Sequence, residues 1–221
     1  MLIIGGTTPG GIGENIAMNA LRLGFKPVTP KPDELDVTSE ESIFGYLNNN
    51  GPFDHVVYCA GVQYLGRLET LDLDEIKAIF DINVIGFIRV LNCLTRTQQN
   101  GKVCAISSLA GRTAMTGSIG YCSSKAALNH AVRCAARELK SHWQITAVVP
   151  ATVGDTPLTA SVDAQVMKIR GWDVHELLKQ EQIRQPFGRR ITKDEVSEVV
   201  LNTLVGPMTL TGSVIDLTGG A

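Results

Sequence analysis

The chain has 221 residues, of which 44% are hydrophobic, and its formal net charge at pH 7 is −2. This length suits one domain with a substantial core, and the balanced charge provides no basic surface for nucleic acid or an anionic membrane. No continuous apolar run approaches the roughly 20 residues that a membrane span needs, so we expect no nucleic-acid or membrane partner.

The cysteines and histidines give no sign of a disulfide framework or a metal site. The five cysteines are scattered, without a C-x-x-C pair, and the four histidines have no metal-ligand spacing. The chain begins directly on an apolar stretch, without the pattern of a signal peptide. We therefore expect a cytoplasmic protein with reduced thiols and no bound metal.

The chain opens with a strand, a glycine-rich turn and a helix. Residues 2–4 are apolar, and residues 12–23 have helical periodicity, closed by Gly24. The turn between them places backbone N–H groups and a helix N-terminus against an anion, and glycine lets a pyrophosphate approach closely. An ordinary glycine-rich turn is the alternative, but its position after the first strand favours a dinucleotide site.

The next part of the chain contains two short predicted strands, at residues 26–29 and 34–38. Only Pro30, Lys31, Pro32 and Asp33 separate them, whereas a crossover between parallel strands needs ten or more residues. The crossover after the second strand is therefore predicted to be trimmed. A capped helix over residues 39–47 and a strand over residues 54–58 follow.

A long helix is predicted over residues 73–97, and it is apolar on nearly all sides. Such a helix is buried on more than one side, and the polar amide of Asn83 in its middle requires a reason. The apolar surface exceeds what one sheet face can cover, so we predict a homo-oligomer, a tetramer or a dimer. Loops of the same chain covering this helix are the alternative.

The most informative stretch follows the predicted strand at residues 103–106. Ser108 lies at the end of this strand, and a helix is predicted over residues 123–139. Tyr121 and Lys125 are four residues apart, so their side chains share one helix face. A phenol titrates near pH 10, but a nearby cation lowers its pKa, so Tyr121 could exchange a proton with an oxygen held by Ser108. For the pair alone, a surface tyrosine packed on a lysine stem is the alternative.

The alternation of strands and helices continues to the end of the chain. A strand is predicted over residues 144–149, a helical segment that covers a pocket over about 158–187, a helix over 192–204 and a strand over 214–217. For the segment 158–187, a peripheral helical hairpin is the alternative. The whole pattern predicts a single α/β domain with a doubly wound parallel sheet.

Several short motifs occur in a specific order along the chain. They are Gly11-Ile12-Gly13, Asp36-Val37-Thr38, Cys59-Ala60-Gly61, Asn83, Ser107-Ser108, Tyr121-x-x-x-Lys125, Thr156-Pro157 and Thr211-Gly212-Ser213-Val214-Ile215. In this order and spacing, over almost the whole chain, they resemble the short-chain dehydrogenase/reductase family. The resemblance implies a Rossmann-type sheet over residues 1–221, an NAD(P) cofactor and hydride transfer between a secondary alcohol and a carbonyl.

The resemblance also implies roles for individual residues. Tyr121 would be the general acid/base, Ser108 would hydrogen-bond the reacting oxygen, and Lys125 would bind the nicotinamide ribose and tune Tyr121. Asn83 would anchor a water that leads protons away, Thr156 would contact the carboxamide, and Asp36 with Val37 would contact the adenine. The full set implied in cofactor binding is Gly6, Thr7, Thr8, Gly11, Ile12, Gly13, Asp36, Val37, Cys59, Ala60, Gly61, Tyr121, Lys125, Pro150, Val153 and Thr156.

The chain departs from the family pattern at four points, none of them at the implied catalytic residues. The glycine turn has one residue more, and so does the segment between Pro150 and Thr156. Tyr58-Cys59-Ala60-Gly61 stands where the family has Asn-Asn-Ala-Gly, and the crossover after the second strand is nearly absent.

The cofactor preference is predicted from Lys31. An NAD-selective site carries a carboxylate at the end of the second strand, and here Lys31 stands at about that place. A lysine offers a charge-assisted contact to the 2′-phosphate of NADP(H), so we predict a preference for NADP(H) over NAD(H). The alternative is a solvated Lys31, with Asp33 near enough to reach the ribose.

The predicted function is an NAD(P)-dependent oxidoreductase that acts on a small alcohol or carbonyl compound. A reductase of ketoacyl groups on a carrier protein is one alternative, which would need a basic patch near the pocket mouth, and Arg189 and Arg190 alone give it little support. The other is a cofactor-binding sensor or scaffold without turnover. Retention of all four implied catalytic residues, Asn83, Ser108, Tyr121 and Lys125, favours the enzyme.

Overall fold

The computed structural model describes residues 1–221, apart from the side chain of residue 184. Its centre is a sheet of five parallel strands in the order β1-β2-β3-β4-β5. The strands are β1 Leu2–Ile4, β2 His55–Tyr58, β3 Gly101–Ile106, β4 Trp143–Pro150 and β5 Val214–Leu217. The first four consist mostly of buried apolar residues, as expected for strands covered on both faces.

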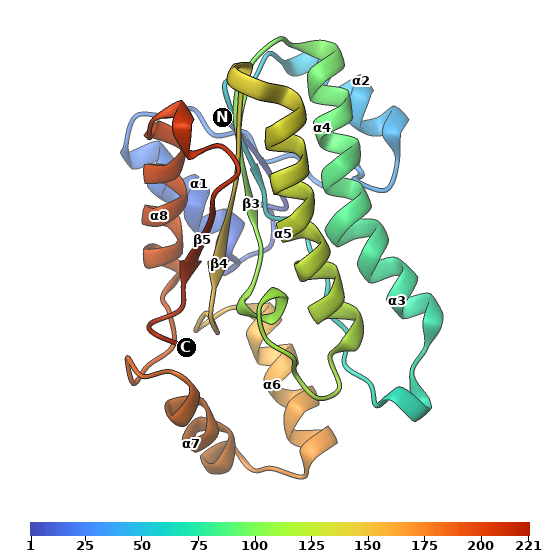
Figure 1. Cartoon of the computed structure of the whole chain (residues 1–221), viewed down its shortest axis with the longest axis vertical. Helices are drawn as coiled ribbons and strands as arrows, with labels where there is room; N and C mark the ends of the chain where they lie inside the picture. Colours follow the sequence, from blue (N-terminus) through green and yellow to red (C-terminus); the bar gives the residue numbers. More distant parts are fainter.

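Helices cover both faces of the sheet, so the predicted Rossmann-type α/β fold is confirmed (Figure 1). Helices α1 and α8 lie on one face, and α2, α4 and α5 lie on the other (Figure 1). A hydrophobic core lies on each face of the sheet, and alternate residues of β2 point into one or the other. Val56 and Tyr58 face α2 and α4, whereas Val57 faces α1 and α8. The helices are α1 Ile12–Arg22, α2 Glu40–Asn50, α3 Leu73–Phe80, α4 Gly86–Thr97, α5 Ile119–Leu139, α6 Pro157–Arg170, α7 Val174–Arg184 and α8 Lys193–Val205.

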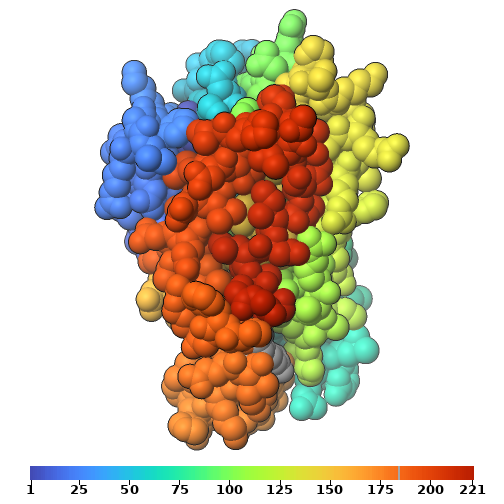
Figure 2. All heavy atoms as spheres, turned by 60° about the vertical axis from the view of Figure 1, so that its left-hand side comes forward, coloured from blue at the N-terminus to red at the C-terminus, as the bar shows by residue number. Residues whose placement is uncertain are grey.

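Helices α6 and α7 extend beyond the carboxyl ends of the strands (Figure 1). From the side, the chain from α8 to the C-terminus covers one face of the molecule, with α7 below it (Figure 2). This arrangement leaves the carboxyl edge of the sheet enclosed by α6 and α7, which we call the cover helices.

The strand predicted at residues 26–29 is reduced to one bridge, in which Val28 pairs with Leu2. Ile3 N donates to Val28 O, and Val28 N donates to Met1 O, both at 2.9 Å. The prediction of a full strand was therefore wrong, because the chain leaves the sheet at Pro30, directly after this bridge.

The strand predicted at residues 34–38 was also wrong, because this segment is a series of turns. The Asp36 carboxylate accepts hydrogen bonds from the backbone N–H and the hydroxyl of Thr38, both at 2.8 Å. These local bonds compete with pairing to a sheet. No helix separates the bridge from α2, so the predicted trimmed crossover is confirmed.

The helix predicted over residues 73–97 is continuous, but its central turn is π-helical. The turn spans Asp81–Ile85 between α3 and α4, and it contains Asn83. π-Helical turns are rare and often occur at functional sites.

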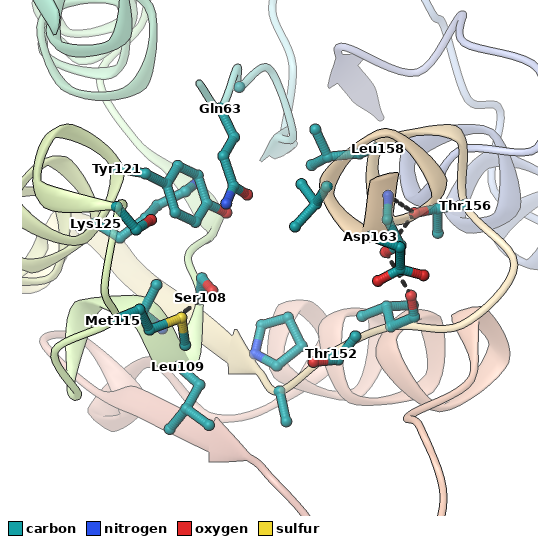
Figure 3. Close-up of a pocket in the computed structure, with 18 of the residues that line it drawn as sticks. Gln63, Ser108, Leu109, Met115, Tyr121, Lys125, Thr152, Thr156, Leu158 and Asp163 are labelled. Atoms are coloured by element: carbon teal, nitrogen blue, oxygen red, sulfur yellow. Dashed lines mark hydrogen bonds between the residues drawn. The ribbon is translucent and has the colours of Figure 1, made fainter. Parts of the chain in front are cut away.

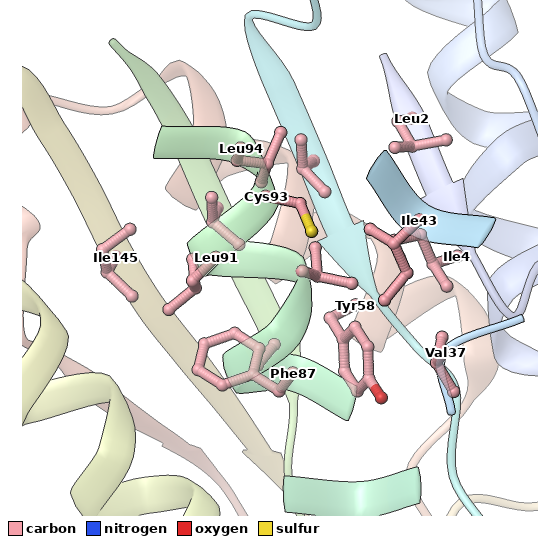
Figure 4. Close-up of a cluster of buried hydrophobic side chains, with 14 of the residues drawn as sticks. Leu2, Ile4, Val37, Ile43, Tyr58, Phe87, Leu91, Cys93, Leu94 and Ile145 are labelled. Carbon is pink, nitrogen blue, oxygen red and sulfur yellow. The ribbon is translucent and has the colours of Figure 1, made fainter. Parts of the chain in front are cut away.

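By length and composition alone, the helix Leu73–Thr97 could span a membrane: its most apolar window of 18 residues has a mean hydropathy of 1.5. Half of the window is buried inside the protein. Phe87, Leu91 and Leu94 pack against the sheet beside Tyr58 (Figure 4). Packing within the domain thus accounts for about half of this apolar surface.

Candidate active site

A cavity of about 320 Å³ lies at the carboxyl ends of the strands. In open α/β sheets this edge is where ligands bind. The cavity is lined by the glycine turn, the ends of β2, β3 and β4, the start of α5 and the cover helices α6 and α7. The predicted site residues that line it are Thr8, Gly11, Ile12, Gly13, Cys59, Gly61, Ser108, Tyr121, Lys125, Pro150, Val153 and Thr156.

The glycine turn brings β1, the segment after β2 and α1 into close contact. Gly5 has a φ of +85°, and a Cβ there would lie 2.5 Å from Ala60 N. A Cβ on Gly13 would lie 2.6 Å from Gly5 O. Only glycine fits at both positions, so this close approach of the three segments requires the glycines of the turn.

The start of α1 suits the phosphates of a dinucleotide. Its N-cap, Gly11, provides no side chain to accept from the first backbone N–H groups, and Gly11, Ile12 and Gly13 line the cavity. Unpaired N–H groups at a helix N-terminus form an anion site. Two neighbouring donors are already engaged: Gly10 N donates to Glu14 Oε2 at 2.7 Å, and Gly11 N donates to Thr8 O at 2.9 Å. The turn therefore fits the implied cofactor.

Tyr121 and Lys125 lie in the first turns of α5, which begins at Ile119, four residues earlier than predicted. The Lys125 Nζ lies 5.6 Å from the centroid of the Tyr121 ring and donates to Ile106 O at 2.8 Å. Their spacing of four residues thus places both side chains on one face, as predicted. Tyr121 and Ser108 border the same space of the cavity (Figure 3).

Burial decides the protonation of this pair. It raises the pKa of Tyr121 to about 12, although the interaction with the Ser108 hydroxyl acts in the opposite direction. Burial also lowers the pKa of Lys125 to about 8. Desolvation of the phenolate is thus the largest effect on the pKa of Tyr121, and its lowering by Lys125 stays a prediction. At neutral pH, Tyr121 is a phenol that can donate a proton.

Asn83 is fully buried and joins α5 to the segment after β2. Its Oδ1 accepts from Val62 N at 2.9 Å, and its Nδ2 donates to Val62 O at 3.0 Å and to Ser124 Oγ at 3.1 Å. This pairing explains a polar amide in an apolar helix, since a buried amide needs partners for both its ends. The water-anchoring role of Asn83 stays a prediction.

The segment after β2 lies directly beside these groups. A Cβ on Gly61 would lie 3.3 Å from Asn83 Oδ1 and 3.6 Å from Lys125 Nζ. Cys59 lines the cavity, and burial raises the pKa of its thiol to about 11, so the thiol is neutral. Sequence reasoning missed Gln63, whose side chain reaches toward Tyr121 (Figure 3). No motif surrounds Gln63, so only the fold reveals it.

Several predicted cofactor residues lie outside the lining of this cavity, namely Gly6, Thr7, Lys31, Asp36, Val37 and Ala60. Val37 is buried in the core beside α4, and the Asp36 carboxylate is engaged by Thr38. Lys31 is exposed, two residues beyond Thr29, whose methyl group covers Gly6. Contact of these residues with a cofactor stays a prediction.

Thr156 has a structural task at the start of α6. Its hydroxyl oxygen accepts from Thr159 N at 3.0 Å and donates to Thr159 Oγ1 at 2.9 Å. Thr156 is thus the N-cap of α6 and lies at the cavity wall. If Thr156 also contacts the carboxamide of the cofactor, as predicted, its hydroxyl must bind the carboxamide and cap α6 at the same time.

Comparison with known protein families identifies one match to a family model. Residues 31–167 match the family described as short chain dehydrogenase.

Two curated relatives match parts of the chain. A vibriobactin-specific 2,3-dihydro-2,3-dihydroxybenzoate dehydrogenase of Vibrio cholerae is 28% identical over 124 residues, which are 53% of this chain and 47% of that protein. The glycine betaine reductase ATRR of Emericella nidulans is 31% identical over 180 residues, 72% of this chain and 14% of that protein. The chain thus spans less than half the length of these relatives.

Two solved structures share the fold over nearly the whole chain. A short chain dehydrogenase family protein from Francisella tularensis has a TM-score of 0.86 at 25% identity, over 99% of this chain and 96% of that one. Actinorhodin polyketide ketoreductase, solved with NADPH, has a TM-score of 0.88 at 23% identity, over 99% of this chain and 95% of that one. At that identity the second match shows the fold alone.

Proposed function

Because this chain belongs to the short-chain dehydrogenase family, an oxidoreductase family acting on alcohol or carbonyl groups, we propose that it transfers a hydride between NAD(P) and a small carbonyl compound or secondary alcohol. One observation carries the proposal: Ser108, Tyr121 and Lys125 line the same cavity as the glycine turn. This placement supports a proton donor and a bound dinucleotide meeting in one cavity. Bound there, the nicotinamide would supply or accept the hydride.

The chain's own residues would handle the proton. In the direction of reduction, the Ser108 hydroxyl holds the carbonyl oxygen, and the Tyr121 hydroxyl gives that oxygen its proton. The phenolate left on Tyr121 is stabilised by the Lys125 ammonium, which lies on the same side of α5. The backbone N–H of Ile12 at the start of α1 would hold a phosphate of the cofactor, and Gly11 and Gly13 would leave room for its approach.

The observed ion pairs weigh against the carrier-protein alternative. Arg189 is bound to Glu195 at 2.7 Å, and Arg190 to Glu181 at 2.7 Å and to Asp163 at 2.9 Å. Both guanidinium groups are thus neutralised within the chain, which leaves little attraction for an acidic carrier.

The proposal is tested by a screen of small ketones, aldehydes and secondary alcohols with NADPH, NADH and their oxidised forms. The measurement is the absorbance of the reduced nicotinamide. We expect turnover with at least one carbonyl compound or alcohol. Tight binding of a nicotinamide nucleotide without turnover across the panel would instead support the sensor or scaffold.

We also propose that NADP(H) is preferred over NAD(H). Lys31 is exposed and follows the bridge that ends beside Gly6 of the glycine turn, so its ammonium is free to reach a 2′-phosphate. Titration calorimetry should give a lower Kd for NADPH than for NADH. Lys31→Ala should weaken NADPH binding about three- to tenfold and leave NADH unchanged, whereas the remote control Lys179→Ala should change neither. Equal or tighter NADH binding by the parent would reject the preference.

A homo-oligomer is proposed from the outer face of the long helix. Ile85 and Ile88 are 41% and 45% exposed on it, and Ile119, at the start of α5, is 50% exposed. Exposed apolar residues on neighbouring helices are typical of an interface. Light scattering at micromolar concentration should give a dimer or tetramer, and Ile88→Glu should shift it toward monomer. The control Leu21→Glu, on the opposite face of the sheet, should have no effect, and a monomeric parent would refute the proposal.

A further inference from the structure

Residues 190–193 are the end of the connection from α7 to α8 together with the first residue of α8. We call them the strap because they contact both halves of the cavity wall. Ile191 forms a parallel bridge with Val153. Ile191 N donates to Thr152 O at 3.0 Å, and Gly154 N donates to Ile191 O at 2.8 Å. The strap backbone is therefore fixed to the loop that follows β4. None of the sequence motifs includes it.

One end of the strap holds the glycine turn. The Lys193 ammonium donates to Gly10 O and to Asp155 O, both at 3.0 Å. Gly10 has a φ of +72° and Asp155 a φ of +54°, a region that non-glycine residues rarely adopt. Lys193 thus ties together two unusual backbone positions, one in the turn before α1 and one in the loop before α6. Both segments are one residue longer than the family pattern.

The other end of the strap holds the cover helices. The Arg190 guanidinium donates to both carboxylate oxygens of Glu181 on α7, at 2.7 and 2.8 Å, and it pairs with Asp163 on α6 at 2.9 Å. About a fifth of each of these three side chains is exposed. A partly buried, forked pairing of this kind fixes geometry better than an exposed ion pair does. Asp163 and Glu181 line the cavity.

We propose that the strap positions the two walls of the cavity separately. Lys193 fixes the glycine turn for the phosphates of the nicotinamide dinucleotide, and Arg190 fixes α6 and α7 for the carbonyl substrate. Neither side chain lines the cavity, so both are positioning residues. The inference rests on the proposed function, but its cofactor half depends only on nucleotide binding.

The test separates the two halves by measuring different constants. Lys193→Met should raise the Kd for NADPH about tenfold in titration calorimetry, and change kcat and the substrate KM less than twofold when NADPH is saturating. Arg190→Met should raise the substrate KM about tenfold and leave the Kd for NADPH within twofold. Lys179→Met, at an exposed lysine of α7, is the matched control and should change neither constant.

Conservative variants distinguish positioning from mere stability. Lys193→Arg keeps a cation that can reach both carbonyls and should restore the Kd to within about threefold of the parent. Arg190→Lys cannot reproduce the fork and should stay impaired. If Lys193→Met does not fold, Lys193→Gln is titrated in its place, with the same increase in Kd expected.

The outcomes that overturn the inference differ from those that overturn the proposed function. Parental NADPH affinity in Lys193→Met or Lys193→Gln, or the same constant changed by both Lys193→Met and Arg190→Met, would refute the inference about the strap. NADPH binding without turnover of any carbonyl compound or alcohol would refute the proposed function and the substrate half, while the calorimetry on Lys193 would still decide the cofactor half. A parent that binds neither NADPH nor NADH would refute both.

Discussion

The variant Tyr121→Phe is expected to lose activity by about 10²–10⁴-fold while binding NADPH with the parental Kd. The substitution removes one hydroxyl and keeps the ring, which is only 8% exposed and packed at the cavity wall. Loss of a general acid/base commonly costs a factor of this size. Because the pKa of Tyr121 is raised to about 12, the parent holds the proton needed for reduction throughout the neutral range.

The control for this variant is Tyr64→Phe. Tyr64 lies in the segment after β2 and is 39% exposed, so loss of its hydroxyl should leave kcat and the substrate KM unchanged. Parental activity in Tyr121→Phe, on any substrate that the parent turns over, would show that another group donates the proton.

The second large effect is expected for Lys125→Met, which should lose activity at least 10²-fold and also weaken cofactor binding. Lys125 is 4% exposed, and its ammonium lies where it can stabilise a phenolate on Tyr121. Methionine has a similar shape without the charge, so the effect reports on the cation. Kinetics at saturating NADPH and calorimetry measure the two losses separately, with the exposed Lys179→Met as control. A variant with full activity would exclude Lys125 from the mechanism.

The pKa of Lys125 gives this prediction a pH dependence. Burial lowers it from an ordinary value of 10.5 to about 8, so the rate of reduction should fall above pH 8 as the cation is lost. Between these two pH values the unfolded chain binds one proton more at this lysine than the folded chain does. The free energy of unfolding should therefore rise with pH by about 1.4 kcal/mol per unit in this window.

The stability of Lys125→Met should lack this rise. Urea denaturation of the parent and of the variant, at several pH values from 7 to about 10.5, gives the difference directly. Parallel curves for the two proteins would mean that Lys125 titrates at its ordinary pKa.

The meeting of Ser108, Tyr121 and Lys125 in one cavity was predictable from helix spacing and from the topology of a parallel sheet. Helical spacing alone places Tyr121 and Lys125 on one face. The carboxyl ends of parallel strands meet at one edge of the sheet, which brings Ser108 beside the glycine turn. A polar residue such as Asn83 in an apolar helix indicates that its side chain has a hydrogen-bond partner. The sequence does not indicate that this partner is the backbone of Val62.

The rest depends on contacts that sequence patterns do not encode. Strands were predicted at residues 26–29 and 34–38, but a strand needs a neighbour to pair with, and here only Val28 finds one. The positions of Lys193 and Arg190 follow from bonds to segments between 9 and 183 residues away. The pKa of Tyr121 depends on how deeply the fold buries it, which the spacing of Tyr121 and Lys125 does not reveal.

The central claim is that a hydride passes to the substrate while Tyr121 supplies the proton. Single-turnover reaction of the parent with NADPH deuterated at the transferred position, and a carbonyl compound from the screen, tests it most directly. Mass spectrometry of the product should show one deuterium on the carbinol carbon with the parent, and no product on the same timescale with Tyr121→Phe. An alcohol without deuterium, or equal product from the Tyr121→Phe variant, would contradict the account.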